Sequence, residues 1–600
     1  MSWIDTNDRN FDATCLHDLF LEQAAKTPDA VALVDYNIDS DQRDPVELTY
    51  GQVNEITDVL AIKLNEEYGV GPDSVVGILL PRCAQYVIAY IAILKAGGAY
   101  MPLELVYPIP LLERAVGETN TKLVFTNSMY SDRIHDSSLV FELDDKYPFF
   151  ELEDDKITEK FSYPSPSYVR PNADNLAFCV MSSGTTGIPK GICQTHRAAV
   201  HSYLDRAIRF PYNKSVDDEN NNIVDDRIGA GVFFVWELFR PLAFGGTCVI
   251  IPDHILFDPD AVTKFVQTYG VTRILWTPSL LQLVLDTVSP DDVRERLSGL
   301  RYMWLCGEVV SRDLAVGFAS LLPDVELMNL YSISECHDVS IGDLKRELLS
   351  PQPSSNSNES GDNAIRKYAT CGTAIPGVKF YIVDLEPNTG SSMKLVPDGE
   401  TGEVYVGGPV VGRGYLNMPE KTAERFVDNP FLTNDDIIYA PRLYRTGDLG
   451  RVLPVSKELE ILGRCDFMVK IRGYSVVLGA IETALARHPK LSSSVVLAVG
   501  EEGSRDKKLV AYVVPVAWDD PPSASNVRQF LKDLVPTYSI PSTFCVIDAL
   551  PVAASAAGKL DRKKLPSHEV ARRLRAFSDD IGDDTNNTAT VRLSPKNDTE

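Results

Sequence analysis

A run of small residues, hydroxyls and one lysine occupies Ser182–Gly191 (SSGTTGIPKG). It follows an apolar run, LAFCVM, that predicts a strand, and it precedes an amphipathic segment, beginning near His196, that predicts a helix. The backbone N–H groups of such a loop can surround a phosphate, and its glycines allow the close approach. The loop lacks the Gly-Lys-Ser/Thr ending of a Walker A motif, and its setting disfavours an ordinary turn. We therefore predict a phosphate-binding loop of another type.

The elements that position this loop follow from hydrophobic patterning. Ser74–Leu80 (SVVGILL) predicts a strand, Ala84–Ala96 a helix and Lys122–Phe125 (KLVF) a further strand, and this alternation continues to about residue 460. Such alternation is typical of parallel sheets covered by helices. From Asp466 to about Leu565, short strands, two helical segments and one more strand predict a small α+β domain. We expect an α/β fold with a large N-terminal domain and this small C-terminal one.

Composition excludes several classes of function. The 600 residues are too many for one hydrophobic core, and 44% hydrophobic with 24% charged residues is typical of a globular protein. A net charge of −26 argues against nucleic acid or an anionic membrane as partner. The N-terminus, MSWIDTNDRN, is not a signal peptide, and the apolar stretch Gly229–Pro252 is interrupted by Glu237 and Arg240. Ten cysteines without metal spacing predict reduced core thiols and a cytoplasmic protein.

Polar segments predict loops and a linker. Val216–Asp226 and Pro351–Asn363 are rich in Asp, Asn and Ser and predict surface loops. After Pro566, a basic helical patch precedes the Asp/Asn/Thr-rich segment Ser578–Thr590. The last residues, RLSPKNDTE, resemble the opening of a carrier-protein domain, where a polar N-cap precedes the first helix. We therefore expect the native protein to be longer than this chain.

Further motifs stand in a fixed order around the phosphate loop. They are LTYGQV at Leu48, LKAGGAYMPLE at Leu94, FVWELFRPL at Phe234, NLYSISE at Asn329, GEVYVGG at Gly402, YRTGDLGR at Tyr444, GRCDFMVKIRGYSV at Gly463 and GKLDRKKLP at Gly558. Together, over about residues 15 to 565, they resemble the adenylate-forming superfamily, and most of all the adenylation domains of nonribosomal peptide synthetases. The resemblance implies an ATP-binding and acid-binding core (1–464), a mobile C-terminal subdomain (465–565) and a linker with the start of a carrier domain (566–600).

The resemblance also implies the nucleotide site. Glu335 matches the Mg²⁺ ligand, for which a hard carboxylate oxygen is suited, and Ser334 keeps a hydroxyl for a phosphate. Tyr331 is expected to stack on adenine, Asn329 to bind its amino group and Asp448 to hold the ribose hydroxyls. The expected ATP-binding residues are Ser182, Ser183, Gly184, Thr185, Thr186, Gly187, Lys190, Gly307, Asn329, Tyr331, Asp448 and Arg451.

Catalysis and thiol transfer are implied by the C-terminal motifs. Lys559 matches the catalytic lysine, whose ammonium offsets charge on the α-phosphate while pyrophosphate leaves. Asp466 matches the hinge about which the small domain rotates, and Gly473 and Tyr474 match residues of a phosphopantetheine tunnel. The chain departs from the family pattern at Ser332-Ile333-Ser334-Glu335, at Ala557 and at Ala480, and none of these departures removes a catalytic group.

The acid pocket is aligned through the same resemblance. Amino-acid-activating relatives carry an aspartate, four residues before the tryptophan of the VWE motif, that pairs with the substrate ammonium. Here that position is Val232, so an ordinary α-amino acid loses its charge partner. The expected wall consists of Val232, Phe233, Trp236, Leu275, Trp304, Cys306, Leu330, Asp338 and Val339.

Three aromatic side chains and one carboxylate suit a quaternary ammonium, which has no N–H and is recognised by aromatic faces and a nearby anion. A flat aromatic acid and a β-amino acid remain alternatives. The pocket pattern and the linker further resemble the adenylation domains of fungal carboxylic acid reductase-like synthetases that act on glycine betaine. That resemblance implies loading of glycine betaine onto a carrier thiol and reduction towards choline by NADPH-dependent reductase domains in the same polypeptide. A free-standing acyl-CoA or aryl-CoA ligase and a non-catalytic binding module are the other classes of protein to be tested.

Overall fold

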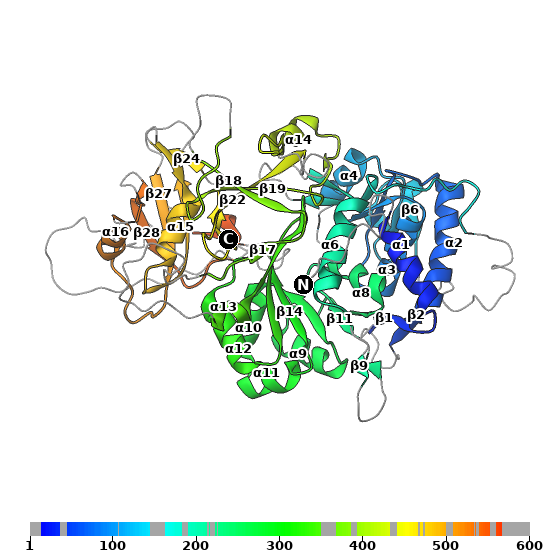
Figure 1. The fold of residues 1–600 in the computed structure, drawn as a ribbon, viewed down its shortest axis with the longest axis horizontal. Coiled ribbons are helices and arrows are strands. Elements are labelled where there is room, and N and C mark those ends of the chain that lie inside the picture. The colour runs from blue at the N-terminus through cyan, green and yellow to red at the C-terminus, as the bar shows by residue number, and fades with distance from the viewer. Residues whose placement is uncertain are drawn as a thin grey trace.

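Two large sheets and their helices form the N-terminal part of the molecule. The computed structural model describes residues 14–36, 45–105, 107, 109–143, 163–182, 190–212, 215–216, 223–224, 226–349, 368–385, 393–432, 441–465, 468–471, 474–499, 508–532, 534–535, 539–551 and 560–566. Figure 1 shows the N-terminal elements at one end of the long axis, the middle of the chain at the centre and the C-terminal elements at the other end.

The central sheet is parallel in its middle and antiparallel at both edges. Its strand order is β17 (Thr373–Ala374), β16 (His337–Asp343), β15 (Glu326–Ile333), β14 (Tyr302–Cys306), β13 (Arg273–Trp276), β11 (Arg227–Ala230), β12 (Thr247–Ile250), β1 (Val31–Asp35) and β2 (Val46–Thr49). In the parallel part, Cys306 at the end of β14 lies in register with Leu330 of β15. Residues that follow neighbouring strands therefore meet at one edge of this sheet.

The second sheet carries the phosphate loop. Its order is β20 (Gly414–Tyr415), β8 (Lys190–Thr195), β7 (Leu176–Ser182), β4 (Ala99–Pro102), β3 (Val75–Ile78), β5 (Val124–Thr126) and β6 (Val140–Glu142). The predicted strand before the loop is confirmed as β7, and the predicted strands SVVGILL and KLVF correspond to β3 and β5. Strands β7 and β8 pair antiparallel, with Ser182 opposite Lys190, and residues 183–189 lie outside the described residues.

The helices of this part include the two that the sequence predicts at Ala84 and His196. The helices of this part are α1 (Leu16–Lys26), α2 (Tyr50–Tyr68), α3 (Ala84–Lys95), α4 (Ile109–Glu118), α6 (His196–Arg209), α7 (Phe234–Glu237), α8 (Phe239–Phe244), α9 (Pro259–Thr268), α10 (Pro278–Thr287), α11 (Pro290–Leu297), α12 (Arg312–Leu321), α13 (Leu344–Leu349) and α14 (Pro419–Arg425). Three of them begin with a capping side chain and a proline, namely at Asp258, Thr277 and Ser289.

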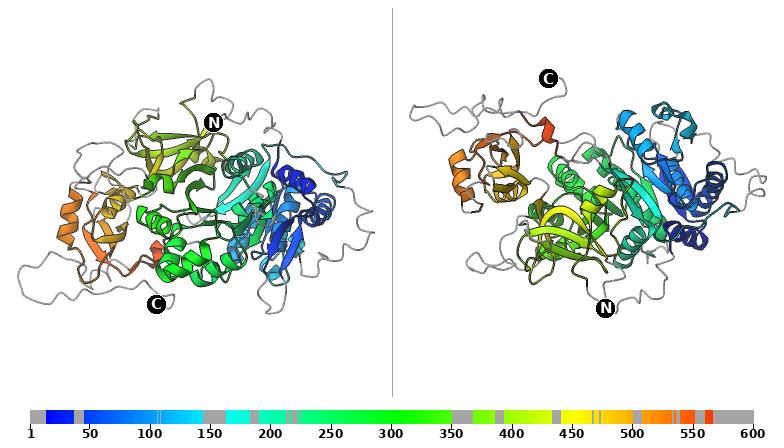
Figure 2. Two further views of the ribbon diagram at one scale, coloured as in Figure 1. Left: turned by 60° about the horizontal axis from the view of Figure 1, so that its bottom comes forward. Right: turned by 90° about the horizontal axis from the view of Figure 1, so that it is seen from above.

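Two apolar cores bind these layers together. Helices α1, α2, α3 and α8 fill the space between the sheets, in a cluster that joins Leu33 and Ile250 of the central sheet to Val76 and Phe178 of the second. Helices α9 to α12 cover the other face of the central sheet, and Figure 2 shows them packed along it. The cysteines confirm the prediction of free thiols, and nine of the ten are buried. No helix in the described ranges has the length and apolar character needed to cross a bilayer.

A third, antiparallel sheet follows, and the small α+β domain is confirmed. The sheet contains β18 (Lys379–Val383), β19 (Gly402–Gly407), β22 (Arg442–Val452), β21 (Phe426–Asp428) and β23 (Leu459–Arg464). The small domain contains β24 (Met468–Ile471), β25 (Tyr474–Val477), α15 (Leu478–Ala486), β26 (Leu491–Val499), β27 (Lys508–Pro515), α16 (Ala524–Lys532) and β28 (Thr543–Val546). It has its own apolar core, which includes Ile481, Ala511 and Phe544.

The predicted loop at Val216–Asp226 contains a short ladder between β9 (Ser215–Val216) and β10 (Ile223–Val224), whereas Pro351–Asn363 lies outside the described residues. The sequence did not predict this ladder, because each strand is only two residues long and the segment as a whole is polar.

A buried group of ligand-type side chains joins α1 to α6. One ligand atom each of Cys15, His17 and His196 lies within 4.8 Å of the others. The backbone N–H of Leu16 donates to Nδ1 of His196 at 3.2 Å. A neutral His196 therefore carries its proton on Nε2, which leaves no lone pair there for a metal ion. We interpret this group as a structural contact that holds α1 against the start of α6.

Candidate active site

Three side chains converge near the ends of β7 and β8, the strands that flank the predicted phosphate loop. Lys190, the first residue of β8, holds its ammonium 4.9 Å from the ring centroid of Tyr415. The Tyr415 hydroxyl donates to Oε1 of Glu335 at 3.0 Å. Strand β20, which carries Tyr415, pairs with β8, and Glu335 lies in the turn between β15 and β16. A cation and a carboxylate from distant motifs are thus held next to the ends of β7 and β8.

The backbone around Glu335 is fixed by two hydrogen bonds. The side-chain amide of Gln194 donates to the carbonyl of Ser334 at 2.8 Å, and the N–H of Gly412 donates to the carbonyl of Glu335 at 2.9 Å. Burial, followed by the nearby cations Lys421 and Arg425, holds the pKa of Lys190 below its ordinary value. Among the described residues, Oε2 of Glu335 accepts no hydrogen bond, so it remains available to a cation.

A cavity of about 430 Å³ opens beside Lys190. Its lining includes Arg114, Lys190 and Lys421 as cations and Glu420 as an anion. Figure 1 shows the two helices that contribute to it, α4 and α14, near one another. The excess of positive charge suits an anionic ligand such as a polyphosphate.

The expected nucleotide residues lie on adjacent strands. The Tyr331 hydroxyl, from β15, donates to a carboxylate oxygen of Asp448 in β22. The Asp448 N–H donates to Oγ1 of Thr446 at 2.9 Å. Burial, followed by the Asp448 carboxylate, raises the pKa of Tyr331 well above its ordinary value, so the phenol stays a donor. The structure therefore brings together the residues expected to contact adenine and ribose.

Two further nucleotide candidates are already engaged within the protein. The side-chain N–H of Asn329 donates to the carbonyl of Thr370 at 2.8 Å. This bond turns the amide so that its oxygen remains as the acceptor that an adenine amino group requires. The guanidinium of Arg451 pairs with Glu460 at 2.6 Å across β22 and β23. Arg451 would therefore have to break or share this ion pair in order to contact a nucleotide.

The predicted acid-pocket residues separate into neighbouring apolar clusters. One cluster contains five of the predicted wall residues, with Phe233 packed against it: Leu275, Trp304, Cys306, Leu330 and Val339. Val232 lies in the core on the other face of the central sheet, and Trp236 packs against the core between the sheets. The ring of Trp236 meets His337 edge to face at 5.1 Å. Six of the predicted wall residues thus lie together, whereas Val232 and Trp236 pack against different cores.

Phe233 has an unusual backbone. Its φ of 54° lies in the left-handed region, which a bulky residue rarely adopts, and it directly precedes α7. Its ring lies on Gly307, where a Cβ atom would be 2.8 Å from Cζ of Phe233. Phe233 thereby connects a predicted acid-pocket position to a predicted ATP-binding position.

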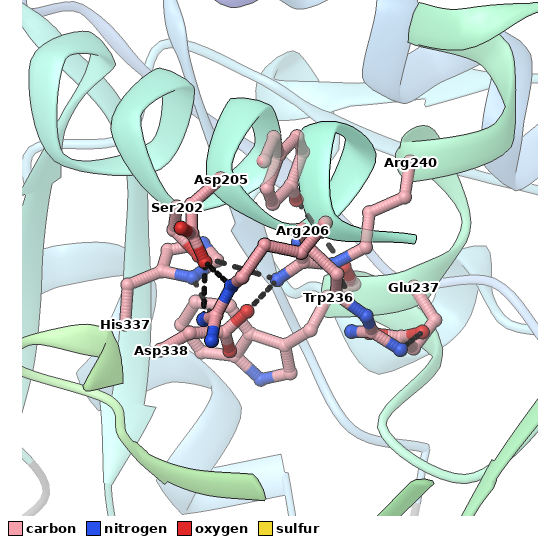
Figure 3. A network of polar contacts seen from close by, with 10 residues as sticks. Ser202, Asp205, Arg206, Trp236, Glu237, Arg240, His337 and Asp338 are labelled. Carbon is pink, nitrogen blue, oxygen red and sulfur yellow. Dashed lines mark hydrogen bonds and ion pairs between the residues drawn. The ribbon is translucent and has the colours of Figure 1, made fainter. Parts of the chain in front are cut away.

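A buried ion network includes the predicted wall residue Asp338 and reaches the predicted wall residue Trp304 (Figure 3). Arg206 of α6 makes two parallel hydrogen bonds to Glu237, at 2.8 and 3.0 Å. Arg240 of α8 bonds Glu237 at 3.1 Å and Asp338 at 2.6 Å. Burial alone would raise the pKa of Asp338, but Arg240 and then His337 hold it well below the usual range. Asp338 is therefore an ionised carboxylate with a protein partner.

Sequence reasoning named Asp338 but missed Tyr415, Arg206 and Arg240. Their only sequence signals are a tyrosine after a Gly-Arg-Gly turn and arginines on otherwise apolar helical faces. Of the remaining predictions, Lys559, Asp466 and Gly473 lie outside the described residues, and Tyr474 begins β25.

Comparison with known families gives matches over most of the chain. A model described as AMP-binding enzyme matches residues 20–416, and one described as AMP-binding enzyme C-terminal domain matches residues 480–557. The glycine betaine reductase ATRR of Emericella nidulans is 36% identical over 92% of this chain and 40% of its own length. A dimodular nonribosomal peptide synthase of Bacillus subtilis is 32% identical over 93% of this chain and 22% of its own length. The chain thus spans less than half of either relative.

Solved structures share the fold. NpsA of Klebsiella oxytoca, in complex with 3-hydroxyanthranilyl-AMSN, aligns with a TM-score of 0.68 at 20% identity, over 91% of this chain and 98% of that one. A four-domain nonribosomal peptide synthetase bound to AMP and glycine aligns with a TM-score of 0.67 at 24% identity, over 94% of this chain and 38% of that one. At these identities the likeness supports the architecture of both parts of the molecule.

Proposed function

This chain belongs to the AMP-binding enzyme family as an adenylation domain of the nonribosomal peptide synthetase type, and on that premise we propose that it adenylates glycine betaine and transfers it to a carrier thiol. The observation that carries the proposal of adenylation at this site is the convergence of Lys190, Tyr415 and Glu335 beside the phosphate loop. In the proposed arrangement Asp448 and Tyr331 hold the nucleoside, and Lys190 faces the leaving phosphates. We further propose the domain limits 1–464 and 465–565, with 566–600 leading into a carrier domain.

The donor set fits the metal that the family uses. A partly exposed carboxylate with one oxygen held by Tyr415 and the other available suits Mg²⁺, which binds through one or two carboxylates and substrate phosphates. When bound, Mg²⁺ would neutralise phosphate charge. The protein positions the carboxylate: Gln194 and Gly412 fix the backbone at Ser334 and Glu335, and Tyr415 orients one carboxylate oxygen.

The proposed reaction has two steps. A carboxylate oxygen of the acid attacks the α-phosphorus of ATP, an acyl–phosphate bond forms, and the bond to pyrophosphate breaks. Lys559 offsets the charge on the transferring group. A phosphopantetheine thiolate then attacks the acyl carbon, a thioester forms and AMP leaves. Reduction of that thioester towards choline would need NADPH and reductase domains outside this chain.

Two observations support glycine betaine. Val232 removes the carboxylate that would pair with an α-ammonium, and Phe233 and Trp236 offer aromatic faces to a cation that has no N–H. The Emericella nidulans relative, 36% identical, is named a glycine betaine reductase. An aryl acid or a β-amino acid is the second candidate, since aromatic walls suit flat acids as well.

The test is ATP–pyrophosphate exchange with matched acids. Glycine betaine and 3,3-dimethylbutyrate have the same shape and differ by one positive charge. Recognition by two aromatic faces predicts about a tenfold or greater preference for betaine. Lys559→Ala is expected to abolish most exchange, whereas the matched surface variant Lys532→Ala keeps it. Equal turnover of the two isosteres would exclude cation recognition, and turnover of benzoate or β-alanine instead would favour the second candidate.

A further inference from the structure

Arg206 lies on the buried face of α6. The helix begins at the cap residue Thr195, whose hydroxyl accepts from the N–H of Ala198. Ala199, Tyr203 and Arg206 are all buried on it, and the Arg206 side chain is 8% exposed. An arginine at such a position needs partners that satisfy its charge and its donors. Glu237, whose side chain is 6% exposed, supplies them through the two parallel hydrogen bonds.

The guanidinium of Arg206 also covers Trp304. Its Cζ atom lies 4.2 Å from the ring centroid, which is a close cation–π contact. Phe210 meets the same indole edge to face at 5.8 Å, and Tyr302 stacks beside it at 5.3 Å. Trp304 is consequently 2% exposed. The sequence predicts that Trp304 contacts a cationic substrate, but the guanidinium of Arg206 already covers its ring.

The charges around this position cancel. Arg206 and Arg240 carry two positive charges, and Glu237 and Asp338 carry two negative ones, all on side chains no more than 8% exposed. The carboxylate of Asp205, in the same group, is paired with Arg209. Burial holds the pKa of His337 below its ordinary value, so that ring stays neutral at pH 7. Figure 3 shows the four charged side chains in one connected group next to Trp236. A neutral wall suits an acid that is itself a zwitterion.

We propose that Arg206 is a specificity-determining residue, which fills the space over Trp304 and so restricts the pocket to small acids. This inference rests on the proposed function, because it takes Trp304 and Asp338 as walls of the acid pocket. Arg206 limits the length of the acid by volume, and its pairing with Glu237 keeps the wall uncharged. Arg206 therefore determines the length of the accepted acid, whereas other residues recognise its charge.

The test compares two acids of different length. Glycine betaine has one methylene between nitrogen and carboxylate, and γ-butyrobetaine has three. The double variant Arg206→Ala with Glu237→Gln removes the guanidinium without leaving an unpaired buried charge. We expect its kcat/KM ratio to move about tenfold or more towards γ-butyrobetaine, which is the effect of one or two methylenes in an apolar pocket. The KM for ATP should stay at the wild-type value.

Two further variants keep the test decisive. Arg206→Met with Glu237→Gln removes the same charges but retains most of the side-chain volume, so its ratio should stay within about threefold of wild type. Arg206→Lys keeps the charge and shortens the reach over Trp304, and a shift of about threefold is expected if the alanine variant does not fold. An unchanged ratio in the alanine variant, or in the lysine variant when the former is unfolded, overturns the proposal.

Failure of the proposed substrate gives a different result. The neutral pair 3,3-dimethylbutyrate and 5,5-dimethylhexanoate differs in length as the two betaines do. If wild-type protein prefers neutral acids, betaine recognition is wrong, but the alanine variant should still move the ratio towards the longer neutral acid. If neither pair shows a shift, the assignment of Arg206 is wrong whatever the substrate.

Discussion

Replacement of Gly307 by alanine tests the contact that joins the two halves of the proposed site. Gly307 has a φ of 88°, and a Cβ atom there would lie 2.8 Å from Cζ of Phe233. Left-handed backbone costs an alanine about 1–2 kcal/mol. Overpacking against the partly buried ring of Phe233 adds about 1–3 kcal/mol, because this ring packs against two apolar clusters.

Gly270 provides the matched control. Its φ is 60°, and the nearest atom to a new Cβ is Cδ of Arg227 at 3.9 Å. Gly270→Ala should therefore cost the backbone strain alone, and the two variants share any gain from a stiffer unfolded chain. The difference between them isolates the overpacking, about 1–3 kcal/mol, and is measured by urea unfolding followed by tryptophan fluorescence.

The contact itself is measured by a double-mutant cycle. Phe233→Leu removes the ring edge that meets Gly307, so it should restore part of the stability lost in Gly307→Ala. We expect a coupling free energy of about 1–3 kcal/mol between the two positions. In exchange assays Gly307→Ala should raise the KM for the acid, because the displaced ring lines its pocket. Costs that are equal for Gly307→Ala and Gly270→Ala, with no coupling to Phe233, would refute the reasoning.

The nucleotide site and the buried histidines give three more predictions. Glu335→Gln should raise the Mg²⁺ concentration needed for half-maximal exchange by about 10–100-fold, and a requirement equal to wild type would contradict the assigned ligand. Asp448→Asn should lower kcat/KM for ATP by about 10–100-fold through loss of charge-assisted hydrogen bonds, with the KM for the acid unchanged. Burial lowers the pKa of His17 to about 3, so the unfolded chain takes up a proton below about pH 6.5 and the folded one does not. Stability contributed above pH 6.5 is thus lost as pH falls, by about 2 kcal/mol per such group at pH 5, and His17→Gln should reduce the measured loss between pH 7 and pH 5 by that amount.

Local order along the chain was predictable. The strand before the predicted phosphate loop and the helices at Ala84 and His196 follow from hydrophobic periodicity, and β7, α3 and α6 confirm them, whereas β8, between the loop and α6, was not predicted. Strand order was not predictable, because β1 pairs with β12 in the central sheet although β1 ends at Asp35 and β12 begins at Thr247. The hydrophobic pattern predicts that a strand is buried, but it does not predict which strand lies next to it in the sheet.

The charged network shows the same limit at the site. Arg206 and Glu237 are 31 residues apart, and Arg240 and Asp338 are 98 apart. Considered alone, each of these residues predicts only a common role, such as an arginine on a helix or a carboxylate in a pocket. Their pairing depends on how α6, α7, α8 and β16 pack, which requires the tertiary structure. Motif alignment could name Asp338 as a wall residue but could not show that its charge already has a partner.

The pairing of Asp338 changes how a cationic acid would be recognised. A free carboxylate near a trimethylammonium group gains about 4 kcal/mol at 4 Å with an effective dielectric constant of about 20. The Arg240 guanidinium, 2.6 Å from Oδ2 of Asp338, opposes most of that field. Trp304 is likewise engaged by Arg206. The groups that remain for the cation are the faces of Phe233 and Trp236, at about 0.5–2 kcal/mol each. We therefore expect discrimination between betaine and its neutral isostere to depend on these two rings and to survive joint neutralisation of Asp338 and Arg240, which leaves the remaining pair, Arg206 and Glu237, balanced.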